Sequence, residues 1–133
     1  MPGTAVHAWI FNAPQAATIM ELTPQLQGRT LVLNPAGRID HTHADGFKLA
    51  LDPHLRDCTR DGAPLVIDFS QVSYISSIGL RALMVAIKQV KAQGGRMVLA
   101  ALTPLVQEVF TISRFDMLFE IFPDRAGALA AVA

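Results

Sequence analysis

The stretch DFSQVSYISSIGLRAL, residues 68–83, contains the change of pattern that decides the fold. Leu65–Phe69, which runs into it, is a short apolar segment typical of a buried central strand. The residues that follow have the i, i+3, i+4, i+7 spacing of an amphipathic helix, namely Leu80, Leu83, Met84, Ile87 and Val90. The stretch therefore predicts a buried strand that leads into a helix, with two serines and a glycine at the junction.

The rest of the chain repeats this alternation of apolar runs and helical spacings. Ala44–Cys58 has one apolar helix face, with Pro53 inside it, where we expect a kink or a new turn. Gly94-Gly95 ends the helix that follows the serines, and Thr103 and Pro104 open another as cap and first residue. The remaining predicted elements are strands at Thr18–Leu22, Thr30–Leu33, Met97–Leu102 and Leu118–Phe122, and a terminal helix, Arg125–Val132, capped by Asp124.

Strands that alternate with helices indicate an α/β fold whose later strands are parallel. Thr18–Leu22 and Thr30–Leu33 both precede the first helix, and they predict one antiparallel pair at the edge of the sheet. Residues 1–16 follow no period and are predicted to form an N-terminal arm, so that the folded domain spans residues 17–133.

Composition limits the partners of this domain. The 133 residues carry 11 Lys and Arg against 11 Asp and Glu, which argues against nucleic acid or an anionic membrane surface as partner. No run approaches the ~20 apolar residues of a membrane span. A single cysteine, Cys58, cannot form an intramolecular disulfide, and we expect a cytoplasmic protein.

Ser76 and Ser77 stand where the predicted helix exposes unpaired N–H groups and a partial positive charge. A phosphate on Ser77 could accept those N–H groups, and its charge of about −1.5 to −2 would be felt by a partner docked over the helix. Alternatively, the serines serve as an ordinary N-cap. The residue pattern by itself leaves both interpretations open.

Signals for metal binding and catalysis are weaker. His41 and His43 lie between Asp40 and Asp45, but no further His or Cys is spaced to complete a metal site, and a polar loop is the simpler interpretation. Ser77 lacks the Gly-x-Ser-x-Gly context of a hydrolase nucleophile, and no phosphate-cradling glycine-rich loop occurs. We predict a binding module with no catalytic residue, metal site or cofactor; a ligand-binding α/β enzyme is the competing hypothesis.

The order of these pieces resembles the STAS domain of anti-sigma factor antagonists over roughly Ala17–Val132. The resemblance is carried by Gly37–Asp40, Val66–Ser70, Ser77–Leu80 and Gly94-Gly95. It implies a mixed, mostly parallel sheet of four to five strands with about four helices.

The resemblance also implies a mechanism. In this family the unphosphorylated antagonist binds an anti-sigma factor, often a serine kinase, and so frees the sigma factor. Phosphorylation of the serine ahead of the Gly-Leu helix opening ends binding, and a phosphatase, of the PP2C type, restores it. In this chain the phosphoacceptor is then Ser77, with Ser76 as second choice. The implied partner surface, on a monomer or weak dimer, consists of Asp40, Ser76, Ser77, Ile78, Gly79 and Arg81.

Two positions depart from the family's pattern. Ser76 stands where many members have Asp, and Ile78 is larger than the usual small residue and is expected to narrow access to Ser77. These departures favour an alternative, an adaptor that does not switch, in a larger signalling or transport complex. For two residues of the implied partner surface a structural role is the alternative. Asp40 could be a helix or turn cap, and Arg81 could be a solvated surface residue.

Overall fold

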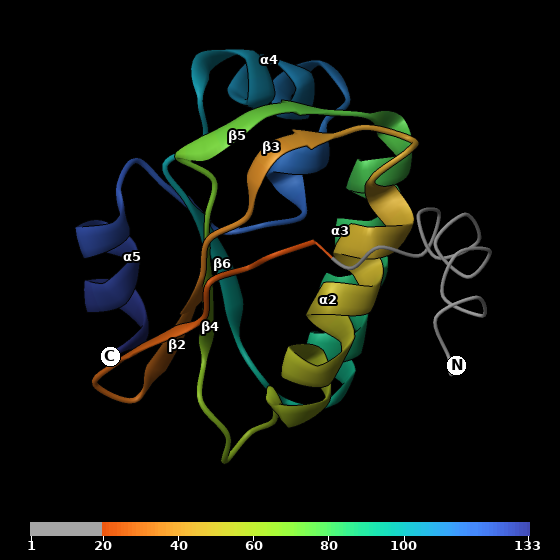
Figure 1. Cartoon of the computed structure of the whole chain (residues 1–133). Coiled ribbons are helices and arrows are strands. Elements are labelled where there is room, and N and C mark those ends of the chain that lie inside the picture. Colours follow the sequence, from red (N-terminus) through yellow and green to blue (C-terminus); the bar gives the residue numbers. More distant parts are fainter. Residues whose placement is uncertain (1–19) are drawn as a thin grey trace, which may run out of the picture.

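The computed structural model describes residues 20–133 (Figure 1). The predicted arm, residues 1–16, lies outside the described residues. The described strands are β1 (Gln25–Gln27), β2 (Thr30–Leu33), β3 (Ala36–Ile39), β4 (Leu65–Asp68), β5 (Gln71–Ile75), β6 (Met97–Ala100) and β7 (Ile121–Phe122). The helices are α2 (Ala44–Asp57), α3 (Ser77–Ala92), α4 (Pro104–Ile112) and α5 (Arg125–Val132), with a 3-10 turn, η2 (Phe115–Met117), after α4.

The main sheet has five strands in the order β1-β2-β4-β6-β7. Only β1 runs antiparallel to its neighbour; the pairs β2–β4, β4–β6 and β6–β7 are parallel. Together with the helices α2, α3, α4 and α5 of the described chain, this confirms the predicted mixed, mostly parallel α/β fold. The antiparallel edge pair is confirmed as well.

The position predicted for the first strand is wrong. Residues 20–22 form no strand, while residues 18 and 19 lie outside the described part; the strand that pairs with β2 is β1. Gly28 sets this register, because its φ of +64° suits a tight turn between β1 and β2. Leu22 is buried in the core, which explains an apolar residue at this position without a strand. Its carbonyl accepts a hydrogen bond from the Asn34 N–H at 2.6 Å.

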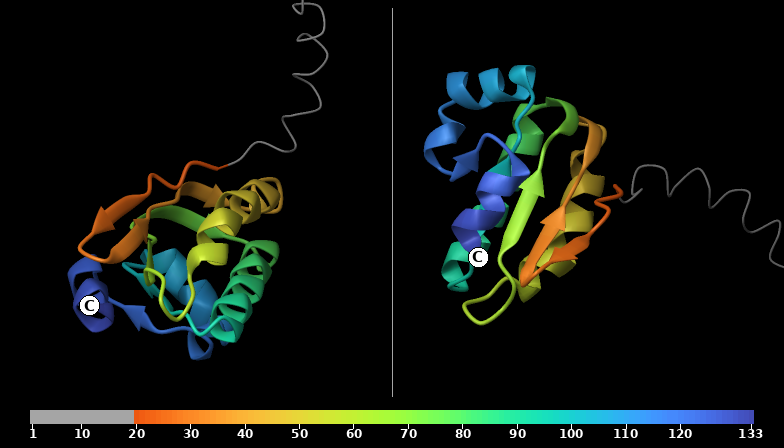
Figure 2. Two further views of the ribbon diagram at one scale, coloured as in Figure 1. Left: turned by 90° about the horizontal axis from the view of Figure 1, so that it is seen from below. Right: turned by 90° about the vertical axis from the view of Figure 1, so that its left-hand side faces the viewer.

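Successive side chains of the central strands point to opposite faces of the main sheet and so contribute to two separate apolar clusters. Leu65 and Ile67 of β4 face the main core beneath α2 and α3, whereas Val66 faces a smaller cluster around Ala128 of α5. Met97 and Val98 of β6 alternate in the same way. Figure 2 shows α5 on the side of the sheet away from α2 and α3. Both faces of the central strands are therefore covered, as expected for parallel strands.

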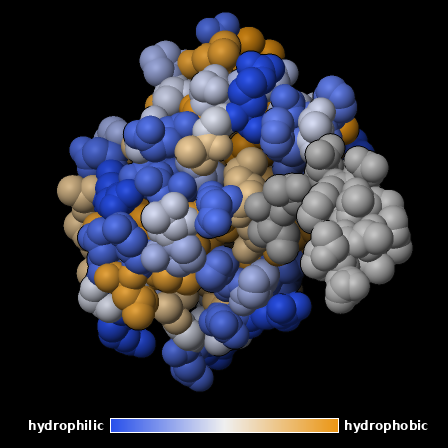
Figure 3. Space-filling model, in the orientation of Figure 1, coloured by the Kyte–Doolittle hydropathy of each residue, from blue (hydrophilic) through white to orange (hydrophobic). Residues whose placement is uncertain are grey.

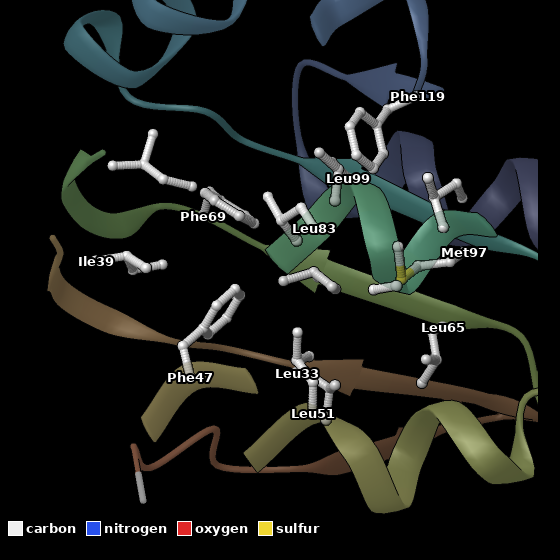
Figure 4. Close-up of a cluster of buried hydrophobic side chains, with 14 of the residues drawn as sticks. Leu33, Ile39, Phe47, Leu51, Leu65, Phe69, Leu83, Met97, Leu99 and Phe119 are labelled. Atoms are coloured by element: carbon white, nitrogen blue, oxygen red, sulfur yellow. The ribbon is translucent and has the colours of Figure 1, made fainter. Parts of the chain in front are cut away.

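The main core is filled by side chains from both layers. Figure 4 shows Phe47 and Leu51 of α2 and Leu83 of α3 pointing toward Leu33 and Leu65 of the sheet. All of these side chains are buried, which confirms the predicted apolar faces of the two helices. The face of the molecule shown in Figure 3 is mostly hydrophilic, although hydrophobic side chains gather over α4 at the top and in a further group at the lower left.

A second, two-stranded parallel sheet joins β3 to β5, and the sequence pattern did not reveal it. From the sequence, the residues around Gly37 were interpreted as the broken end of the preceding strand. The residues of β5 were interpreted as a connection that leads to the serines. Gly37, at φ +88°, lies where the register of this pair shifts. This small sheet brings Ile39 next to Ile75, directly ahead of α3.

Helix termini agree with the sequence in most places. Helix α2 continues through Pro53, which is exposed. Gly94, at φ +76°, ends α3, and the Asp124 carboxylate caps α5 by accepting from the Gly127 N–H at 2.7 Å. Thr103 precedes α4 but makes no side-chain cap bond; its hydroxyl donates to the Val72 carbonyl at 2.8 Å instead.

Two predicted strands are too long. Ala101, at φ +58°, ends β6 two residues before the predicted Leu102 limit, because a left-handed residue cannot continue a ladder. Only Ile121–Phe122 pairs as β7, since Leu118 follows a 3-10 turn. Within residues 20–133, no helix has the length and apolar character needed to cross a bilayer.

Candidate functional site

The junction between β5 and α3 presents its two serines differently. Ser76 is the N-cap of α3: its Oγ accepts a hydrogen bond from the Gly79 N–H at 3.2 Å, and its backbone carbonyl accepts from the Leu80 N–H at 2.9 Å. Ser77 is the first residue of the helix and is exposed. Among residues 20–133, its hydroxyl has no hydrogen-bond partner. The cap interpretation therefore holds for Ser76, while Ser77 is left with an accessible hydroxyl.

Gly79 allows the small sheet to approach the start of α3. A Cβ atom at this position would lie 2.9 Å from the Ile39 carbonyl oxygen and 2.9 Å from the Ile75 side chain. The Ile39 carbonyl also accepts a hydrogen bond from the Ser76 N–H at 2.9 Å. Gly79 itself is buried beneath the start of α3.

Asp40 follows Ile39 directly and therefore lies at the same edge as the serines, as predicted. Its carboxylate accepts hydrogen bonds from the backbone N–H groups of Thr42 and His43, at 3.1 and 3.2 Å. The His43 Nδ1 atom lies 2.7 Å from the same oxygen, and the Arg38 guanidinium lies 3.5 Å from the other. The hydrogen bond with the His43 ring is the main reason that the pKa of Asp40 lies below its ordinary value. Asp40 thus stabilises the turn that enters α2.

Arg38 is held on its other side by an aromatic ring. Its guanidinium carbon lies 4.5 Å from the centre of the Tyr74 ring, across the β3–β5 pair. Sequence analysis considered His43 beside Asp40 only as part of a weak metal signal, and it did not single out Arg38 or Tyr74. The spacing Arg38-x-Asp40 was visible, but the pairing of β3 with β5 that brings in Tyr74 was not.

Helices α2 and α3 lie side by side (Figure 1). A small groove of about 180 Å³ lies between their first turns. Ile78 and Arg81 of α3 line it, together with Val85 one turn further on. The side chains of Ile78 and Val85 are 49% and 45% exposed, which is high for aliphatic residues. The opposite wall, which the sequence analysis missed, consists of Ala44, Asp45 and Lys48 of α2.

The predicted site residues thus share one end of the molecule. Ser77 directly precedes Ile78 of the groove, and its neighbour Ser76 is hydrogen-bonded to Ile39, next to Asp40. The site combines exposed apolar groups with charges of both signs and an accessible hydroxyl. Such a surface is suited to binding another protein, since the groove is smaller than the ~300–1,000 Å³ of typical small-molecule sites.

Comparison with known proteins agrees with this fold. The family model described as the STAS domain matches residues 21–128. BtrV of Bordetella bronchiseptica, whose name describes it as an anti-sigma factor antagonist, is 42% identical over 67 residues, which cover 50% of this chain and 58% of that protein. The matched part is therefore less than two thirds of the relative's length.

Solved structures give the same result. An anti-sigma factor antagonist from Mycobacterium paratuberculosis has a TM-score of 0.72 at 25% identity, over 82% of this chain and 90% of that one. The Bacillus cell fate determinant SpoIIAA, in its phosphorylated form, has a TM-score of 0.62 at 18% identity, over 84% of this chain and 98% of that one. The chain belongs to the STAS domain family.

Proposed function

We propose that this protein is an anti-sigma factor antagonist that regulates transcription by partner switching. In its unphosphorylated form it binds an anti-sigma factor with serine kinase activity, which releases a sigma factor. Phosphorylation of Ser77 ends that binding, and a phosphatase of the PP2C type reverses it. The protein acts in the cytoplasm by binding and does not catalyse a reaction.

The observation that carries this proposal is the exposed Ser77 hydroxyl at the first position of α3. Ser76, the second choice, is a poorer acceptor because its Oγ is already engaged with the Gly79 N–H. A kinase would have to break that cap to reach Ser76, whereas modification of Ser77 leaves the cap in place.

Electrostatics explain why a phosphate on Ser77 would alter binding more than folding. The start of a helix has unpaired N–H groups and a partial positive charge, so a phosphate is tolerated there. On the outside of the molecule, the modification replaces a neutral hydroxyl by about −1.5 to −2 charges beside the apolar Ile78. A partner surface that packs on Ile78 would then lie next to this negative charge. Acidic groups on that surface would be repelled by it, and apolar groups would have to be buried against it, so that binding would weaken.

The neighbouring residues have defined parts in this proposal. Ile78 and Val85 supply apolar contact area, and Arg81 and Lys48 supply positive charge across the groove. Asp40 acts mainly by stabilising the turn at the edge of the site. Gly79 permits the close approach of β3. The names of BtrV and of the Mycobacterium paratuberculosis protein support antagonist function for relatives of this chain.

The test uses protein purified from its own host under several growth conditions. Trypsin releases residues 61–81 as one peptide, and its fragmentation distinguishes phosphate on Ser77 from phosphate on Ser76. We expect one phosphate, on Ser77, and none on this peptide in the Ser77→Ala variant. Absence of phosphate under every condition would contradict the switch.

Binding is tested with the partner that co-purifies with the unphosphorylated protein. Ser77→Asp should weaken this complex at least about tenfold, equivalent to 1.4 kcal/mol, while Ser77→Ala should bind like the wild type. Ser73→Asp is the matched control, because Ser73 is also exposed but lies on β5, outside the groove. Equal weakening by both Asp variants would contradict a specific role of Ser77.

A second candidate is an adaptor of the STAS type that does not switch. The exposed Ile78 beside Ser77 favours it, because a branched side chain there restricts the approach of a kinase. This adaptor would keep the same partners in Ser77→Ala and Ser77→Asp strains, as judged by affinity purification and mass spectrometry.

A further inference from the structure

A second pocket in the described residues lies at the other end of α3, far from the serines. It has a volume of about 570 Å³ and lies where the parallel strands begin. The left view of Figure 2 looks onto this end, where the β1–β2 turn, the loop before β4 and the C-terminal helix lie. Residues of all three segments line the pocket. Its size is within the range of small-molecule sites in proteins, about 300–1,000 Å³.

Three arginines from three different loops line this pocket. Arg29 comes from the β1–β2 turn, Arg60 from the loop after α2, and Arg96 from the start of β6. The Arg96 guanidinium is committed, because it donates to both oxygens of Glu120 and to the Ala131 carbonyl. Arg29 and Arg60 form no ion pair with any of residues 20–133, and the lining within that range includes no aspartate or glutamate. Two guanidinium groups are thus left to attract an anion.

The loop that carries Arg60 is held in place by close backbone packing. A Cβ atom on Gly94 would lie 3.2 Å from Arg60 Nε and 3.6 Å from its Nη2, so the guanidinium lies over this glycine. The Gln93 amide donates to the carbonyls of Leu55 and Cys58, at 2.8 and 2.9 Å, which ties the loop to the end of α3. The backbone of the loop that carries Arg60 is therefore held in place before any ligand binds, which lowers the entropic cost of binding.

Part of the pocket lining is apolar. Leu129 and Val132 of α5 contribute to it, together with Pro64 from the loop that carries Arg60. A ligand that carries an organic group as well as negative charge would contact both kinds of surface. A simple inorganic ion would use only the arginines.

We propose that this pocket binds an organic phosphate, with its phosphate between Arg29 and Arg60 and its organic part against Leu129 and Val132. A phosphate monoester carries about −1.5 to −2 charges at neutral pH, which matches the two unpaired guanidinium groups. Guanidinium forks bind phosphate oxygens in pairs, so Arg suits this role better than Lys. The pocket is separate from the Ser77 site, and its occupancy does not depend on the function proposed above.

The experiment follows backbone amide NMR signals of the full chain while phenyl phosphate is added. Glycine amides are well suited as reporters, because Gly28, Gly62, Gly94 and Gly95 all line the pocket. We expect these signals to shift saturably, while the signal of Gly79, at the other end of α3, stays unchanged. Shifts spread evenly over the chain, or shifts that never saturate, would overturn the proposal.

Variants and probe chemistry test the assignment independently. Arg29→Gln and Arg60→Gln should each weaken phenyl phosphate binding at least fivefold, whereas Arg114→Gln, which removes the same charge beyond the pocket, should leave it unchanged. Inorganic phosphate and benzoate should both bind more weakly than phenyl phosphate. Benzoate binding as tight as phenyl phosphate would overturn the choice of phosphate, and equal weakening by Arg114→Gln would reduce the effect to general charge attraction.

Discussion

The two ends of helix α3 are built from the same materials but present different surfaces. At each end a glycine allows backbone segments to approach: Gly79 lies against Ile39, and Gly95 lies against the Cys58 carbonyl. At the N-terminal end the result is a small groove of about 180 Å³ with the exposed Ser77 hydroxyl near it. At the C-terminal end it is a pocket of about 570 Å³ lined by arginines.

The difference between the ends comes from what covers them. Residues of α2 and α3 line the groove, which displays aliphatic side chains such as Ile78. The β1–β2 turn and α5 help to line the pocket at the other end, whose volume is about three times larger. A small groove with exposed aliphatic side chains is suited to a protein partner, and a larger pocket lined by arginines is suited to a small ligand. The following predictions test this division, from the largest expected effect to the smallest.

Gly95→Ala should have the largest effect. Its Cβ would lie 2.2 Å from the Cys58 carbonyl oxygen, so the backbone must move, and we expect a loss of about 3 kcal/mol in the free energy of unfolding. Gly79→Ala meets contacts at 2.9 Å and should lose about 2 kcal/mol. Gly28→Ala is the control with open space around it, and it should lose only about 1 kcal/mol for its left-handed φ. Urea denaturation measures all three; a Gly95→Ala variant as stable as Gly28→Ala would refute the close approach.

Ile78→Asp should weaken partner binding strongly without unfolding the domain. The change removes a half-exposed aliphatic contact and introduces a charge in the groove, so the proposed complex should weaken at least about tenfold. Leu105→Asp is a close control, because Leu105 is 50% exposed and is also the second residue of its helix, α4. Titration calorimetry compares the two variants. If Leu105→Asp weakened binding as much, the partner surface would lie over α4.

Ser76→Ala and Ser77→Ala should distinguish the serine that caps α3 from the serine with an exposed hydroxyl. Loss of the Ser76 side chain leaves the Gly79 N–H without its acceptor, and we expect a loss of about 1 kcal/mol in stability. Ser77→Ala should change stability by less than about 0.5 kcal/mol, because its side chain is exposed. Thermal and urea unfolding provide the measurement. Equal losses in both variants would mean that the two hydroxyls share the cap.

His43→Ala should have the smallest effect, a rise in the pKa of Asp40 toward its ordinary value. The His43 ring is the main cause of the lowered pKa, so part of the shift remains through the backbone N–H groups. Because the folded-state pKa is lowered, the ionised carboxylate stabilises the fold above the unfolded pKa of about 3.9 and loses this effect as the pH falls. Carbon-detected NMR titration of the Asp40 carboxyl measures the change. An unaltered pKa in the variant would assign the shift to the turn alone.

Features that depend on residues close together in the chain were predicted correctly, whereas features that depend on distant residues were not. Leu80, Leu83 and Ile87 predicted the buried face of α3 because helix periodicity is local. The edge strand was placed too early, since Leu22 is apolar for burial in the core and not for strand pairing. The β3–β5 pair was not predicted, because each strand is short and its partner is distant in the chain.

By itself, the sequence determined the alternation of strands and helices, the burial of their apolar faces and a serine pair at the start of α3. These features depend on side-chain spacing within a few residues and on the unpaired N–H groups of a helix start. Only the tertiary structure decided which serine is the cap, that Ile39 packs on Gly79, and that three arginines meet in one pocket. Those outcomes depend on segments far apart in the chain, and their approach is set by how the two layers pack on the sheet.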